Sequence, residues 1–154
     1  AHKITDFGQV LGCSKINVPE ETQAILLISD GRFHAVSLAL ESNLPVYILN
    51  REKLEKISGD EIKQLKTRKK ASYIKFLNVN KVGILISTKP RQENLKEALE
   101  IKNKLNNLEK NFYLFLANNI DISEFENFGL KSYINTACPR LDMDSNVVNM
   151  KDLG

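Results

Sequence analysis

The sequence predicts an α/β fold made of two similar βαβ-type domains, each a parallel sheet flanked by helices. Two observations carry this prediction. Short, continuous aliphatic runs are typical of strands buried on both faces, and a stretch with helical periodicity follows such a run before the next begins. With 154 residues, 42% of them hydrophobic, the chain is long enough for one or two small domains with apolar cores.

The N-terminal third of the chain predicts the first βαβ unit. The apolar run at residues 24–28 indicates a strand buried on both faces, and Ser29-Asp30-Gly31 ends it. A helix is expected from there to about Ser42, where Asn43-Leu44-Pro45 stops it, and residues 46–49 form the next strand. Strand, helix and strand in this order predict a parallel pair with a right-handed crossover.

A lysine-rich stretch at residues 63–75 predicts a helix that connects the two units. Its spacing favours a solvated helix, and a docking face for an acidic partner is the alternative. The apolar residues that recur at roughly helical spacing are Ile57, Ile62, Leu65, Tyr73, Ile74 and Leu77. Because no Pro-, Gly- or Ser-rich linker separates the units, we expect them to pack closely.

The second unit begins with a strand at residues 82–87 and continues through a helix from about Glu93 to Leu108. Later strands are expected at residues 112–116 and 132–134. The apolar positions of the helix step by three or four, as one buried stripe requires. They are Leu95, Ala98, Ile101, Leu105 and Leu108.

Composition narrows the class of protein. The 22 basic and 19 acidic residues give a net charge of +3, too mild to predict direct nucleic-acid binding. The sequence has no apolar segment of roughly 18 residues, so no membrane association is expected. Two cysteines and no recognisable signal peptide predict a reducing, cytoplasmic location. Since the cysteines form no CxxC pair, their spacing excludes a zinc finger and a thioredoxin motif.

The segment Cys138-Pro139-Arg140 follows the apolar run at residues 132–134 and is a candidate metal-binding or reactive site. Pro139 suits the first turn of a helix, where its missing N–H costs nothing. Free helix N–H groups and the Arg140 guanidinium would then favour the Cys138 thiolate, the form that binds metal or attacks electrophiles. A small buried structural cysteine is the alternative.

Cys13 also follows a short apolar run, so both cysteines are expected where strands end. Two thiolates alone do not hold an iron–sulfur cube, and a shared cluster would need a further ligand. We expect the Cys13 and Cys138 sulfurs to lie within roughly 15 Å of each other, in one cofactor-sized cleft.

The Asp30-Gly31 pair marks a strand that leads directly into a helix. Free N–H groups at such a helix start can bind an anionic ligand at the carboxyl edge of a sheet. The alternative is that Asp30 is an ordinary N-cap, worth about 1 kcal/mol. The residues alone favour the N-cap reading.

Four short segments carry a resemblance to a known family, and they occur in this order along the chain: residues 8–13, 30–34, 82–89 and 135–140. Together they resemble the diphthamide synthase family, the 2-(3-amino-3-carboxypropyl)histidine synthases of archaea and eukaryotes. The resemblance implies a triplicated α/β architecture in which each domain gives one cysteine to a 4Fe–4S cluster. By this resemblance Cys13 is the second-domain ligand and Cys138 the third-domain ligand.

The resemblance also implies domain bounds and a reaction. Residues 1–78 would be a partial second domain with the connecting helix, and residues 79–154 the third domain. The cluster would cleave S-adenosylmethionine, held by Asp30, Gly31 and Arg32, and the 3-amino-3-carboxypropyl radical would add to a histidine of translation elongation factor two. No catalytic residue beyond the cluster ligands is implied. Such proteins are homodimers or paralogue heterodimers.

The chain has no cysteine upstream of Cys13 to act as the first-domain ligand. We therefore expect the isolated chain to be inactive. A structural or accessory fragment without a working cluster is one alternative, and a quinolinate-synthase-like iron–sulfur enzyme is another. Because the N-terminal strands need cover on both faces, we also expect self-association through the N-terminal half.

Overall fold

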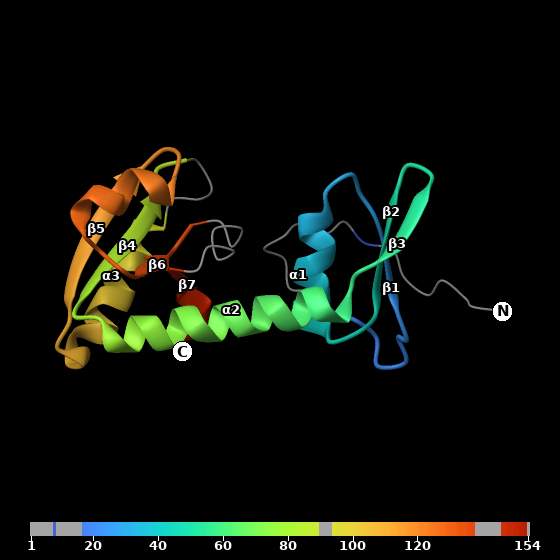
Figure 1. The fold of residues 1–154 in the computed structure, drawn as a ribbon, viewed down its shortest axis with the longest axis horizontal. Coiled ribbons are helices and arrows are strands. Elements are labelled where there is room, and N and C mark those ends of the chain that lie inside the picture. The colour runs from blue at the N-terminus through green and yellow to red at the C-terminus, as the bar shows by residue number, and fades with distance from the viewer. Residues whose placement is uncertain (1–7, 9–16, 90–93, 138–145, 154) are drawn as a thin grey trace. The chain divides into compact units, whose positions relative to one another are not determined.

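The structure, a computed structural model, describes residues 8, 17–89, 94–137 and 146–153. It has two compact units, Ala1–Lys63 and Gln64–Gly154, called here the N-terminal unit and the C-terminal unit (Figure 1). Each contains a sheet with at least one parallel strand pair and an accompanying helix, which confirms the predicted α/β class. Among the described helices, none combines the length and apolar character that a bilayer-spanning segment needs.

The N-terminal unit contains the predicted βαβ arrangement. β1 (Ile25–Ile28) runs parallel to β2 (Val46–Asn50), and α1 (Arg32–Ser42) connects them. The helix closes at Asn43, whose left-handed backbone (φ 54°) is a common helix ending. The helix therefore stops where the sequence predicts.

A third strand, β3 (Lys53–Lys56), pairs with β2 in the antiparallel sense, which makes this sheet mixed, with the order β1-β2-β3. The sequence analysis does not predict β3. Its residues are mostly charged and solvent-exposed, as in many edge strands, whereas the search was for aliphatic runs. The tight turn before it includes Arg51 with a positive φ of 52°.

The two faces of the N-terminal sheet differ. One face packs on α1 and is lined by buried aliphatic side chains: Leu27, Val46 and Ile48. On the opposite face Leu26, Ile28 and Leu54 are 52%, 73% and 60% exposed, and Ile28 and Leu54 share one row of the sheet through Leu49. We call Leu26, Ile28 and Leu54 the outer apolar face. The prediction that residues 24–28 are buried on both faces is therefore wrong for this chain.

α2 (Gly59–Asn78) is the predicted connecting helix, and the boundary between the units falls inside it. Its first turn carries Asp60 and Glu61, which complement the positive end of the helix dipole. In its C-terminal part Ser72 and Phe76, one turn apart, are buried, whereas Tyr73, Ile74 and Leu77, named above for their helical spacing, are 38%, 48% and 48% exposed.

The sheet of the C-terminal unit is entirely parallel over its described strands, with the order β5-β4-β6-β7. Its strands are β4 (Lys81–Ser87), β5 (Asn111–Ala117), β6 (Tyr133–Asn135) and β7 (Val147–Asn149). β4 is central, and its residues from Val82 to Ser87 are all buried, as expected for a strand covered on both faces. The first three strands are predicted from the sequence, and β7 is not.

Two apolar clusters include residues of this sheet. α3 (Leu95–Lys104) buries Ala98 and Ile101 in the larger one, while Leu95 is 38% exposed at the beginning of the predicted stripe. The larger cluster consists of Phe76, Val82, Ile84, Ile86, Ala98, Ile101, Ile134 and Val148. The smaller one, under the 3₁₀ segment η2 (Ile122–Phe128), consists of Leu85, Phe125, Tyr133 and Val147. Alternate residues of β4 therefore face two separate cores.

Candidate functional site

Buried polar side chains gather where β4, β6 and β7 end. Because these strands are parallel, their carboxyl ends meet at one edge of the C-terminal sheet, the edge at which α/β proteins bind ligands. The side chains are exposed by 8% or less, although the strands leading to them are aliphatic. They are Ser87, Asn135, Thr136 and Asn149.

Asn135 and Asn149 form an amide pair at this edge. They are register partners on β6 and β7, and the Asn135 Nδ2 donates to Asn149 Oδ1 at 2.8 Å. The Asn135 Oδ1 accepts the backbone N–H of Ala137 at 2.9 Å. The Asn135 side chain therefore ties the next strand to the turn that follows its own strand.

Thr136 is held on both sides. Its N–H and its hydroxyl both donate to the carbonyl oxygen of Leu85 on β4, at 3.2 and 2.9 Å. Its own carbonyl accepts a 2.7 Å hydrogen bond from Nδ2 of Asn94, the residue before α3. The backbone at residues 135–137 is thus fixed by two strands and a helix start.

The next residue in the sequence, Cys138, lies outside the described residues, as do Cys13 and Arg140. The expected approach of the two sulfurs therefore stays a prediction. Among the residues that the structure describes, no three His, Cys, Asp or Glu side chains come together as metal ligands. Cys13 and Cys138 give the chain a soft thiolate donor set suited to iron, and Cys138 follows a rigidly held strand end, but a cube needs more than two such ligands.

The second predicted site, at the start of α1, lies in the N-terminal unit. The N-cap of α1 is Gly31, and among the described residues no side chain caps the helix. The Gly31 N–H instead donates to the Ser29 hydroxyl at 3.1 Å, and Asp30 is exposed. The reading of Asp30 as an N-cap is therefore wrong, because α1 begins at Arg32 and Gly31 occupies the N-cap position.

Arg32 lies between two carboxylates. Its guanidinium pairs with Glu55 on β3 and with Glu61 in the first turn of α2, each at 2.8 Å. The hydrogen bond with Glu61 is the main cause that raises the pKa of Arg32. A hydrogen bond from Lys53, followed by the charge of Lys53, lowers the pKa of Glu55, and Arg32 adds to this effect. Sequence reasoning identified Arg32 but missed its partners, because their pairing requires the unpredicted β3.

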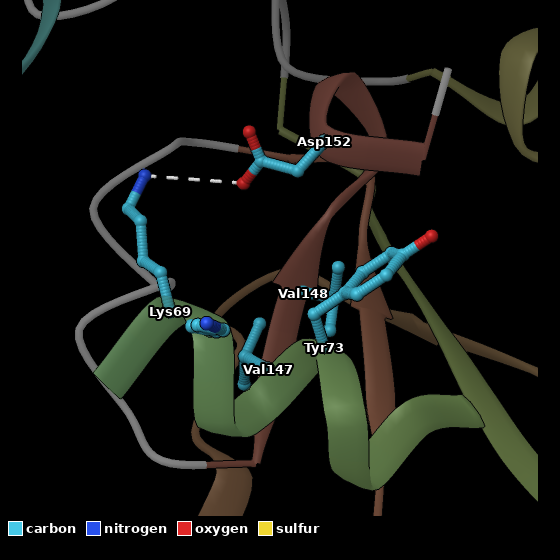
Figure 2. Close-up of a pocket in the computed structure, with 6 residues that line it drawn as sticks. Lys69, Tyr73, Val147, Val148 and Asp152 are labelled. Atoms are coloured by element: carbon cyan, nitrogen blue, oxygen red, sulfur yellow. Dashed lines mark ion pairs between the residues drawn. The ribbon is translucent and has the colours of Figure 1, made fainter. Parts of the chain in front are cut away.

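A shallow groove lies between α2 and the C-terminal end of the chain, within the C-terminal unit (Figure 2). Lys69, Lys70 and Tyr73 line one side, and Val147, Val148 and Asp152 line the other. Figure 2 shows Lys69 reaching across toward Asp152, with 3.9 Å between Nζ and Oδ2. One lysine of the stretch, Lys69, is therefore paired within the unit, and the alternative of an acidic-partner face stays a prediction.

Comparison with known proteins gives a consistent result. A family model described as "Putative diphthamide synthesis protein" matches residues 1–149. The 2-(3-amino-3-carboxypropyl)histidine synthase of Pyrococcus horikoshii is 28% identical over 137 residues, covering 89% of this chain and 40% of the relative. Subunit 1 of the enzyme of that name from Yarrowia lipolytica is 30% identical over 142 residues, covering 89% of this chain and 32% of the relative.

A solved structure agrees in fold. The crystal structure of Dph2 from Pyrococcus horikoshii with 4Fe-4S cluster matches with a TM-score of 0.81 and 27% identity. The match covers 95% of this chain and 44% of that one. The chain thus spans less than half the length of the relatives it matches.

Proposed function

The chain belongs to the diphthamide synthesis protein family, and from this membership we propose that it supplies two cysteine ligands, Cys13 and Cys138, of a 4Fe–4S cluster in a 3-amino-3-carboxypropyl transferase. The observation that carries the proposal is the anchored strand end at residues 135–137, directly before Cys138. A related protein of the same fold was crystallised with such a cluster. Relatives at 28–30% identity are named as histidine synthases.

In this proposal the two units have different tasks. The C-terminal unit, as the third domain, supplies Cys138, which follows the anchored strand end in the sequence, and the N-terminal unit, as part of the second domain, supplies Cys13. When bound, the cluster supplies the electron that cleaves S-adenosylmethionine and releases the 3-amino-3-carboxypropyl group. The receiving group is a histidine of translation elongation factor two, and the setting is the cytoplasm.

Asp30, Gly31 and Arg32 are the proposed contacts to S-adenosylmethionine. The uncapped first turn of α1, as far as the described residues show it, supports this role because its N–H groups can receive a ligand carboxylate. Arg32 is neutralised by Glu55 and Glu61, so its part is to hold the start of α1 against β3 and α2. A ligand carboxylate would then bind the backbone N–H groups of the first turn.

A complete cluster site needs a third thiolate from another part of the family protein, on the same polypeptide or on a partner in a homodimer or paralogue heterodimer. This requirement supports one alternative, an accessory portion that holds no cluster by itself. The family match distinguishes the proposal from a quinolinate-synthase-like enzyme.

Anaerobic reconstitution with iron and sulfide tests the proposal. The chain is combined with the family portion that carries the third cysteine, and the visible charge-transfer absorption and the electron paramagnetic resonance of the reduced sample are recorded. We expect a 4Fe–4S signal that is lost with Cys13→Ser and with Cys138→Ser. An unchanged signal in both variants would contradict the ligand assignment, and no signal in any sample would favour the accessory reading.

A further inference from the structure

Asn135 and Asn149 are unusual residues for their position. They are 2% and 8% exposed at the end of a sheet whose other buried side chains are mainly aliphatic. A buried amide costs free energy unless its donors and acceptors are bonded. Apolar residues of similar size would fill the same space without this requirement. The amide pair therefore calls for a role beyond packing.

The two ends of the Asn135 side-chain amide bond to different parts of the chain. Its Nδ2 donates to Asn149 on β7, and its Oδ1 accepts the backbone N–H of Ala137, two residues further along. A side-chain bond to the backbone two residues on sets a local turn. The orientation of that turn is fixed relative to the sheet because the same amide is bonded to Asn149.

The backbone between these anchors is fixed independently. Thr136 bonds twice to Leu85 and accepts from Asn94. Three consecutive residues, Asn135, Thr136 and Ala137, are thus held by β4, β7 and the residue before α3. The residue that follows in the sequence is Cys138.

We propose that Asn135, oriented by Asn149, is a positioning residue that sets where the chain delivers the Cys138 thiol. The inference rests on the proposed function in that it gives Cys138 a task that requires position. Its physical basis is the bonded geometry of Asn135, Thr136 and Ala137. A thiol at the end of a loosely held segment would reach a shared metal site in many orientations, whereas a fixed turn limits them.

The first test uses the 154-residue chain without metal. In a Cys13→Ser background, Cys138 is the single thiol, and its alkylation by iodoacetamide is followed by mass spectrometry at one fixed pH. We expect Asn135→Ala to raise the alkylation rate by roughly fivefold, the scale of one lost buried hydrogen bond. Asn149→Asp keeps an oxygen that accepts the bond from Asn135 Nδ2, and we expect its rate to lie nearer to wild type than that of Asn135→Ala.

Two control variants separate positioning from general destabilisation. Val148→Ala opens space in the core beside Asn149 without touching the amide pair, and Asn111→Ala removes an exposed asparagine at the opposite end of the sheet. Thermal unfolding of every variant is measured alongside. A rate increase in Val148→Ala equal to that in Asn135→Ala, or no change in Asn135→Ala, would overturn the proposal.

A second readout uses the reconstituted complex with the portion that carries the third cysteine. We expect Asn135→Ala to shift the midpoint potential and the resonance line shape of the cluster, and Asn149→Asp, which keeps the acceptor for Asn135 Nδ2, to lie nearer to wild type. An identical spectrum and potential in Asn135→Ala would count against positioning. Failure of wild type to take up a cluster would refute the proposed function, while the alkylation rates would still decide the role of Asn135.

Discussion

Gly83, on the central strand β4, lies beneath aromatic rings and leaves no room for a side chain. A Cβ placed there would lie 2.8 Å from Cε1 of Tyr133 and 3.1 Å from Cε2 of Phe115. The Tyr133 ring has little freedom to move aside, because it is 1% exposed and its hydroxyl donates to the carbonyl of Phe125 at 3.0 Å. The close packing of β4 against β6 therefore depends on glycine at this position.

We expect Gly83→Ala to lower the free energy of unfolding of the C-terminal unit by about 1–3 kcal/mol, the usual cost of overpacking a core. Urea denaturation followed by circular dichroism measures the change. Gly59→Ala is the matched control, because a Cβ there meets no described atom within 4 Å. A Gly83→Ala protein as stable as wild type would show that the Tyr133 and Phe115 rings can move aside without lowering the free energy of unfolding.

Arg32 provides a prediction that depends on pH. Its side chain is 44% exposed, so we expect Arg32→Ala to cost about 1 kcal/mol or less at neutral pH. The folded-state pKa of Glu55 is lowered, first by Lys53 and then by Arg32, so its contribution is complete above the unfolded pKa and is lost as the pH falls through the folded value. The stability difference between wild type and Arg32→Ala should therefore shrink below roughly pH 4.

Denaturation of both proteins at neutral pH and in acid measures this difference, with Arg68→Ala as a control that leaves the Glu55 and Glu61 pairs intact. A difference that persists undiminished in acid would mean that Arg32 acts through packing of its aliphatic stem.

Residue-level prediction succeeded where chemistry is local and failed where it depends on register. Asp30-Gly31 correctly marked the beginning of a helix, but which of the two residues takes the N-cap position depends on backbone angles. The Asn135–Asn149 pair becomes visible only after β6 and β7 are aligned. Asn149 lies in no segment that the sequence analysis singled out, and residues 135–140 were singled out for Cys138 and not for the Asn135 amide.

At the scale of elements, aliphatic runs identified β1, β2, β4 and β5 because hydrophobic burial dominates in those strands. β3 escaped prediction because its residues are charged, and β7 because a strand of three residues carries little pattern. In α2 the helical spacing of Tyr73 and Leu77 does not reveal the buried side, since Phe76 occupies the core while these two side chains are 38% and 48% exposed. Element type is thus easier to predict than the face that an element buries.

The outer apolar face of the N-terminal sheet leads to a prediction about association. Leu26, Ile28 and Leu54 lie together on an uncovered side, and β1 is the outer strand of the described sheet. Exposed apolar sheet surface and open strand edges favour pairing with another chain. We expect the isolated chain to self-associate at high concentration, and Ile28→Lys to shift it toward the monomer in light scattering.

Leu116→Lys is the matched control, because Leu116 is 57% exposed on a strand of the other unit. Association that Leu116→Lys weakens and Ile28→Lys leaves unchanged would place the contact on the C-terminal unit instead. A strict monomer at high concentration would refute self-association altogether.

At the scale of the whole molecule, the chain carries two cysteines and matches less than half of its relatives' length. We therefore expect the 154-residue chain alone, after anaerobic reconstitution, to form no appreciable methylthioadenosine from S-adenosylmethionine. Two thiolates leave a cube without a ligand, and a labile cluster cannot hold the substrate in a defined orientation.

Addition of the family portion with the third cysteine should restore the product, and Cys138→Ala should abolish it again. Liquid chromatography of the nucleoside product, with mass spectrometry of the target histidine, measures both outcomes. Robust methylthioadenosine formation by the isolated chain would show that a third ligand lies within this chain and that the division of ligands proposed here is wrong.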